Sequence, residues 1–76
     1  MELNKSESGM TWVEIVQAFK EGKTVIDHYV DMFDLVVVHA DENRIDLGVD
    51  GRVYCGYNRE DNNLHESFFC AYEDNV

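Results

Sequence analysis

The stretch from Thr11 to Val25 constrains the fold most, because it carries both start and stop signals for one short helix. Thr11 and Glu14 have the spacing of a capping box, in which each side chain accepts a hydrogen bond from the other residue's backbone N–H. The apolar residues recur at helical spacing and share one face: Trp12, Ile15, Val16 and Phe19. Gly22 favours a left-handed helix end. We expect an amphipathic helix from about Trp12 to Glu21, which needs an apolar surface to pack against.

The rest of the chain predicts strands that would supply this surface. β-Branched and aromatic residues are frequent in five segments, which are 24–30, 32–40, 44–49, 52–57 and 66–72. Between the third and fourth of these segments, Asp50-Gly51 favours a two-residue type I′ hairpin turn. Residues 35–38 are apolar on both faces, as in a central strand whose second face is covered by another element or by another subunit. The prediction is an α+β fold, with one N-terminal amphipathic helix packed on an antiparallel four- to five-stranded meander sheet.

The chain length, 76 residues, predicts one domain. Residues 1–9 are polar and end in Ser8-Gly9, so we expect a flexible arm there and a single α+β domain over 10–76. The N-terminus lacks the apolar core of a signal peptide, and no apolar run approaches the ~20 residues of a membrane span. We therefore expect a cytoplasmic protein.

Charge is the most unusual property of the composition. Sixteen acidic residues face six basic ones, for a net charge of −10. Such a charge repels nucleic acid phosphates and anionic membranes, so we expect neither as a direct partner and a basic protein surface instead. Acidic residues gather in 24–43 and 60–76, which contain no Lys or Arg. If the first and last strands are adjacent, these segments would form one partner-binding surface, for which the candidates are Asp27, Asp31, Asp34, Asp41, Glu42, Glu60, Asp61 and Glu66. A solvated face without a partner is the alternative.

Motifs for metal binding and catalysis are missing from the sequence. The cysteines and histidines lack the close spacing of structural zinc ligands; they are His28, His39, Cys55, His65 and Cys70. A disulfide between the two cysteines would require adjacent strands and an oxidising compartment. Neither the serines nor the glycines form a catalytic or phosphate-binding motif. We expect a binding protein without cofactor or metal, and not an enzyme.

The helix segment resembles a pattern in the Thoeris anti-defence type two sponge family of small phage proteins. The similar positions are Thr11-Trp12, Glu14, Phe19-Lys20, Gly22-Lys23 and Val25, within a stretch of about fifteen residues. That family binds signalling nucleotides and forms homo-oligomers, and relatives have been described as anti-CRISPR proteins. The resemblance implies a helix followed by a sheet and a phage-encoded protein that acts in the host cell cytoplasm.

Charge and resemblance together lead to two functional hypotheses. The first is a phage-type inhibitor, a DNA mimic that occupies a basic nucleic-acid-binding surface of a host or defence protein. The alternative is a homo-oligomeric sponge that sequesters a signalling nucleotide in a pocket at a subunit interface. Aromatic and basic side chains would line this pocket, and the candidates are Arg44, Arg52, Tyr54, Tyr57 and Arg59. A third hypothesis is a structural homodimer that pairs through its central strand.

Overall fold

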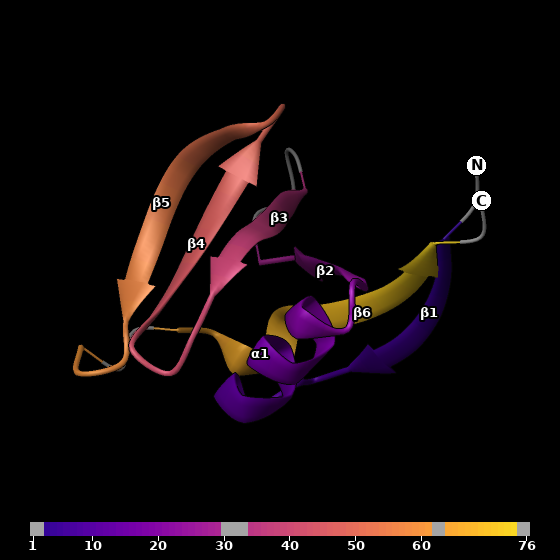
Figure 1. The fold of residues 1–76 in the computed structure, drawn as a ribbon, viewed down its shortest axis with the longest axis horizontal. Coiled ribbons are helices and arrows are strands. Elements are labelled where there is room, and N and C mark those ends of the chain that lie inside the picture. Colours follow the sequence, from indigo (N-terminus) through magenta and orange to yellow (C-terminus); the bar gives the residue numbers. More distant parts are fainter. Residues whose placement is uncertain (1–2, 30–33, 62–63, 75–76) are drawn as a thin grey trace.

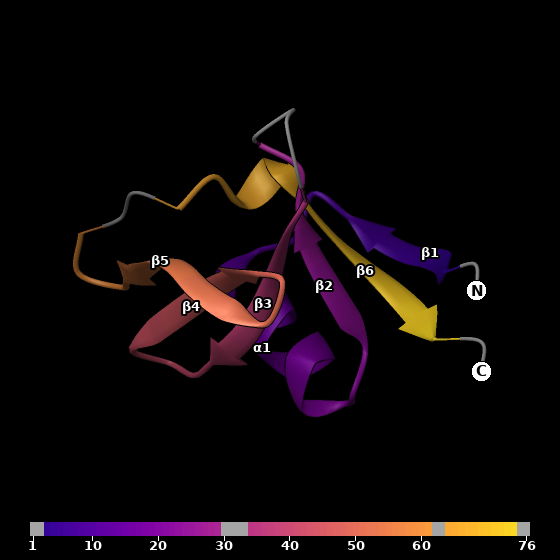
Figure 2. The same cartoon turned by 90° about the horizontal axis from the view of Figure 1, so that it is seen from above.

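The computed structural model describes residues 3–29, 34–61 and 64–74, which form one helix packed on a six-stranded sheet. The elements are β1 (Leu3–Ser8), α1 (Trp12–Lys20), β2 (Thr24–Asp27), β3 (Leu35–Ala40), β4 (Arg44–Val49), β5 (Arg52–Asn58), the 3-10 helix η1 (Glu66–Phe68) and β6 (Phe69–Asp74). The strand order is β1-β6-β2-β3-β4-β5, and every neighbouring pair is antiparallel (Figures 1 and 2). The predicted α+β fold with a helix on an antiparallel sheet is confirmed.

Helix α1 begins and ends at the signals in its sequence. The Glu14 N–H donates to Thr11 Oγ1 at 3.3 Å, and the Thr11 N–H donates to Glu14 Oε1 at 2.9 Å, so the capping box is complete. At the other end Gly22 has a φ of +83°, the Gly22 N–H donates to the Phe19 carbonyl, and the Lys23 N–H donates to the Ala18 carbonyl. These two bonds form a Schellman motif, which satisfies carbonyls that the helix leaves free.

Replacing Thr11 by alanine should lower the free energy of unfolding by about 1 kcal/mol, because the Glu14 N–H loses its acceptor. Urea denaturation followed by circular dichroism would measure this change. Thr11→Ser is the matched control, since it keeps the hydroxyl and should retain most of the stability. Equal losses in the two variants would show that the hydroxyl does not cap the helix.

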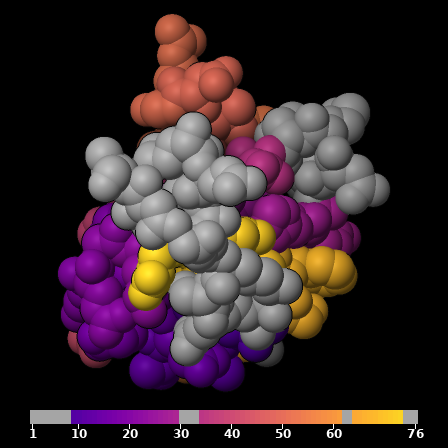
Figure 3. Space-filling view, turned by 90° about the vertical axis from the view of Figure 1, so that its right-hand side faces the viewer, coloured from indigo at the N-terminus to yellow at the C-terminus, as the bar shows by residue number. Residues whose placement is uncertain are grey.

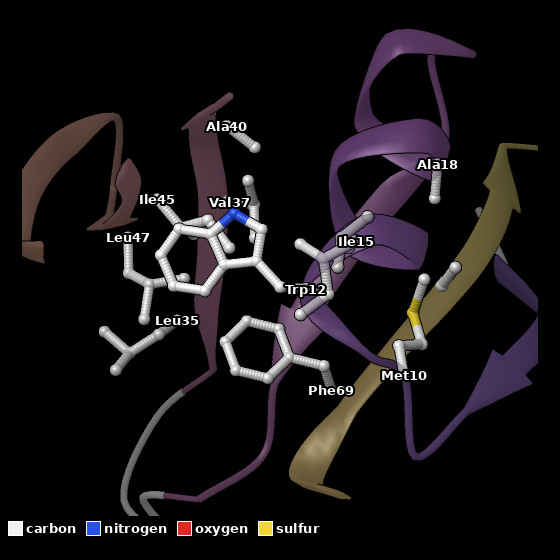
Figure 4. Close-up of a cluster of buried hydrophobic side chains, with 12 residues drawn as sticks. Met10, Trp12, Ile15, Ala18, Leu35, Val37, Ala40, Ile45, Leu47 and Phe69 are labelled. Carbon is white, nitrogen blue, oxygen red and sulfur yellow. The ribbon is translucent and has the colours of Figure 1, made fainter. Parts of the chain in front are cut away.

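The core lies between α1 and one face of the sheet. Helix α1 contacts β2, β3 and β6. The Trp12 ring is buried and lies over Val37, Ile45 and Leu47, with Phe69 beside it (Figure 4). The Trp12 indole N–H also donates to the Asp41 carbonyl at 2.9 Å, which ties the start of the helix to the end of β3.

The β4–β5 hairpin has the predicted two-residue turn. Val49 pairs with Arg52, and the residues between them have positive φ, 53° at Asp50 and 78° at Gly51. A type I′ turn requires this conformation, which glycine adopts without steric penalty and aspartate tolerates. The tip of the hairpin projects beyond the body of the molecule (Figure 3).

The structure corrects the sequence prediction at both ends of the chain. Residues 3–8, expected within a flexible arm, form strand β1 paired with β6. A polar segment can form this strand because its backbone N–H and C=O groups pair with those of β6. This pairing does not require apolar side chains in the segment. The sheet therefore has six strands, and the sequential meander covers only β2 to β5, because β6 lies between β1 and β2.

Two predicted strands are shorter than expected. The first, predicted over 24–30, ends at Asp27, and the last, predicted over 66–72, begins at Phe69 after the 3-10 turn η1. The β3 strand begins at Leu35. The predicted strand residues 30 and 32–33 lie outside the described residues.

Candidate functional site

Asp27, predicted to lie on an acidic surface, is instead buried, with 1% of its surface exposed. It pairs with Leu35 on β3 and Phe69 on β6, and it shares the core-facing side of β2 with Val25. Its Oδ1 accepts the Tyr29 N–H at 2.9 Å, while Oδ2 has no hydrogen-bond partner among the described residues. Asp27 is therefore a buried structural residue and cannot contact a partner in this fold.

The surroundings of Asp27 favour its neutral form. Burial raises the pKa of Asp27, and the opposing influences of the Tyr29 N–H, His65 and His28 are smaller. The Tyr29 and His65 rings stack with their centroids 3.9 Å apart, which links the segment after β2 to the segment before η1. Tyr29 thus contributes its ring to this stack and its backbone N–H to Asp27.

Three predicted acidic residues gather at one end of the sheet, and we call them the acidic turn cluster: Glu42, Glu60 and Asp61. All three are exposed. Glu42 lies in the β3–β4 turn and the other two follow β5, and the Arg59 N–H donates to the Asn43 carbonyl at 2.9 Å between these turns. The cluster is thus held by backbone contacts between two turns.

Asp41 organises the β3–β4 turn. Its Oδ1 accepts the N–H groups of Asn43 and Arg44, each at 2.8 Å, and its Oδ2 lies 2.8 Å from His39 Nε2. The hydrogen bond from His39 and those from the two backbone N–H groups lower the pKa of Asp41 to about 2. Asp41 therefore stays ionised and positions the neighbouring Glu42.

The remaining predicted acidic residues lie elsewhere. Asp34 precedes β3, and the seven residue steps from Asp34 to Asp41 span about 23 Å in an extended strand. Glu66 begins η1 and is half-buried, and Asp31 lies outside the described residues. Although β2 and β6 are adjacent, as the prediction required, the exposed acidic residues lie mainly in turns and form separate groups.

Few carboxylates are neutralised by a cation. Among the described residues, only Glu21 and Asp46 form ion pairs with Lys or Arg, at 3.4 Å to Lys23 and 2.6 Å to Arg44. Asp34 and Asp41 each contact a histidine, which is charged only when protonated. In the part of the chain whose side chains the structure describes, the exposed carboxylates without an ion pair are Glu14, Glu42, Asp50, Glu60, Asp61 and Glu73.

The five residues predicted for an alternative ligand pocket do not converge. Arg44 contacts Asp46 on the sheet face opposite α1, while Tyr57 packs against the core. Arg52 begins β5 and Arg59 follows its last residue, and the two are about 23 Å apart by strand rise. Tyr54 is exposed near the hairpin. The prediction of a pocket at a subunit interface, which a single chain does not test, stays a prediction.

The cysteines are free and lie on strands that are not neighbours. Cys55 is half-buried on β5, and Cys70 is buried on β6, and three strands lie between β6 and β5 in the sheet. Burial raises the pKa of Cys55, and burial also raises the pKa of Tyr57 to about 12. A disulfide between the cysteines has no support in this arrangement.

The described part of the chain lacks a metal-binding cluster and a membrane-spanning helix. No group of three or more His, Cys, Asp or Glu side chains there is arranged to hold a metal ion. No helix in the same part has the length and apolar character needed to cross a bilayer.

Comparisons of the chain with protein-family models, with curated proteins and with solved structures found no match. The resemblance of α1 to the sponge family therefore stays a prediction.

Proposed function

We propose that this protein acts by binding a basic surface of another protein through exposed carboxylates, with the acidic turn cluster as the main contact. The observation that carries the proposal is the lack of charge compensation. Of the described carboxylates, only two contact a Lys or Arg side chain. Their negative field is therefore available to a partner, and it both attracts a basic surface and repels nucleic acid.

The rigidity of the acidic turn cluster favours binding over a merely solvated face. Asp41 accepts two backbone N–H groups within the β3–β4 turn, and the Asn58 side chain donates to Asp61 at 3.3 Å. The backbone bond between Arg59 and Asn43 joins the two turns. Since the turns are already ordered, binding would require less loss of conformational entropy than binding by an unstructured acidic tail.

A surface that normally binds nucleic acid is the target class that fits this chemistry. Such surfaces present Lys and Arg side chains for phosphates, and an ordered set of carboxylates competes for the same groups. In this proposal the protein is an inhibitor that prevents its partner from binding nucleic acid. The proposal also includes a phage origin, with a host or defence protein as the partner.

The triple variant Glu42→Gln, Glu60→Gln, Asp61→Asn should weaken partner binding by about a hundredfold, because each lost contact between charged groups contributes ~1 kcal/mol. The partner would first be captured from lysate at low salt and identified, and its affinity for both proteins would then be measured by calorimetry. Circular dichroism should show an unchanged fold, since all three side chains are exposed.

The matched control is Glu14→Gln, Asp50→Asn, Glu73→Gln, which removes the same charge from exposed positions outside the cluster. It should lower the affinity by less than about tenfold, because it reduces only the long-range attraction between the net charge of the protein and the basic partner. Equal weakening by the two triple variants would show that net charge, and not the acidic turn cluster, determines binding.

A further inference from the structure

We infer a second binding site, in a hollow beside α1, that takes an oxyanion attached to an apolar body. The hollow has a volume of about 380 Å³. Its walls include Trp12, Val13, Val16 and Lys20 from the helix, with Glu42 from the β3–β4 turn and Arg59 from the segment after β5. This volume lies within the range of small-molecule sites. The site is distinct from the proposed partner surface, although Glu42 borders both.

The hollow contains two cations without ion pairs. In the described part of the structure, Lys20 and Arg59 have no carboxylate within ion-pair distance, whereas Lys23 and Arg44 each do. In a chain with sixteen acidic and only six basic residues, two unpaired cations that line one hollow form a local site for a negative charge.

Arg59 is already positioned for such a contact. Its guanidinium lies 5.0 Å from the centroid of the Trp12 ring, in a cation–π arrangement. Stacking uses the flat face of a guanidinium and leaves N–H donors at its edge, which match a carboxylate or a phosphate. The Arg59 backbone is fixed as well, because its N–H donates to the Asn43 carbonyl.

The rest of the hollow indicates what the anion is attached to. Val13 is 69% exposed and Val16 is partly buried, so the helix offers apolar surface beside Lys20. Glu42 and the net charge of −10 act against multiply charged ligands. A monoanion on an aromatic or aliphatic body therefore fits best, and a carboxylate suits the site better than a phosphate dianion.

The test uses phenylacetate as the probe, with Trp12 as the reporter, since Trp12 is the only tryptophan in the chain. Phenylacetate should change the tryptophan fluorescence and the indole N–H resonance saturably. Three related compounds should each bind about tenfold more weakly. Phenylacetamide lacks the negative charge, acetate lacks the apolar body, and phenyl phosphate carries two negative charges where the site prefers one. Equal binding of phenylacetamide would overturn the proposal, because it would show that the anion is not recognised. Tighter binding of phenyl phosphate would overturn the preference for a monoanion.

Substitutions then identify the residues that hold the anion. Lys20→Gln and Arg59→Gln should each weaken phenylacetate binding about tenfold, through loss of a charged contact. Glu42→Gln should strengthen it about threefold, because a repelling carboxylate is removed. Arg52→Gln, the control with the same charge change at the far end of β5, should bind like the parent protein. Unchanged affinity in Lys20→Gln and Arg59→Gln, or no gain in Glu42→Gln, would exclude this site.

Discussion

Replacing Phe69 by alanine is expected to remove a large part of the stability of the protein. The Phe69 side chain is fully buried and packs in the core beside Trp12 (Figure 4). Removal of a buried phenylalanine ring lowers the free energy of unfolding by about 3–5 kcal/mol. A domain of this size has a total stability of only about 4–11 kcal/mol, so the loss removes much or all of it.

The neighbouring residue supplies the matched control. Phe68 is 44% exposed and makes edge contacts with the rings of Tyr29 and His65. Phe68→Ala should therefore lower the free energy of unfolding by about 1 kcal/mol. Urea denaturation monitored by Trp12 fluorescence and circular dichroism would compare the two variants. Similar losses would contradict the position of the core between α1 and the sheet.

Asp27→Asn is expected to stabilise the protein at neutral pH by about 1–2 kcal/mol. Burial raises the pKa of Asp27, and its Oδ2 has no hydrogen-bond partner among the described residues, so the charged form of this side chain is costly to bury. Asparagine is neutral, has nearly the same shape and keeps the acceptor for the Tyr29 N–H. Thermal and urea denaturation at neutral pH would measure the gain.

The same residue predicts a pH dependence whose sign follows from its raised pKa. The folded protein holds the Asp27 proton more tightly than the unfolded chain does. This contribution to stability is complete below the unfolded pKa of about 4, and it is lost as the pH rises through the folded pKa. The stability of Asp27→Asn relative to the parent should therefore increase as the pH rises from the unfolded pKa of Asp27 to its folded pKa.

Asp41 has the opposite effect on the pH dependence of stability. The difference in stability between variant and parent is therefore more informative than the stability of the parent alone as a function of pH. Its pKa is lowered to about 2, and its contribution is present above the unfolded pKa and is lost as the pH falls toward 2. Glu60→Gln is the charge-matched control for Asp27→Asn, because it removes the same charge from an exposed position outside the core. A destabilised Asp27→Asn protein would show that the Asp27 charge has a favourable partner in the fold.

The local elements could be predicted because their signals are local. The capping box, the glycine at the helix end and the Asp50-Gly51 turn determine backbone geometry within a few residues, and all three are present in the structure. Strand β1 has no such signal. Its polar residues form a strand only because β6 offers a free edge, which is a property of the tertiary structure.

The candidate site was less predictable than the fold. Grouping acidic residues by sequence segment placed Asp27 with the exposed ones, although its i, i+2 relation to buried Val25 was a signal for the core face. The contact between Arg59 and Asn43, which brings Glu42 close to the residues after β5, depends on how the two turns pack. The sequence separation of these residues conceals that contact.

The salt dependence of partner binding tests the central claim most directly. Salt screens the attraction between exposed carboxylates and a basic surface, so binding through these carboxylates must weaken as the salt concentration rises. The partner captured from lysate would be titrated with the parent protein and with the triple variant of the acidic turn cluster over a range of salt concentrations. We predict a steep fall in the parent's affinity with rising salt and a clearly shallower slope for the triple variant. An affinity that does not change with salt, or identical slopes for the two proteins, would contradict the account.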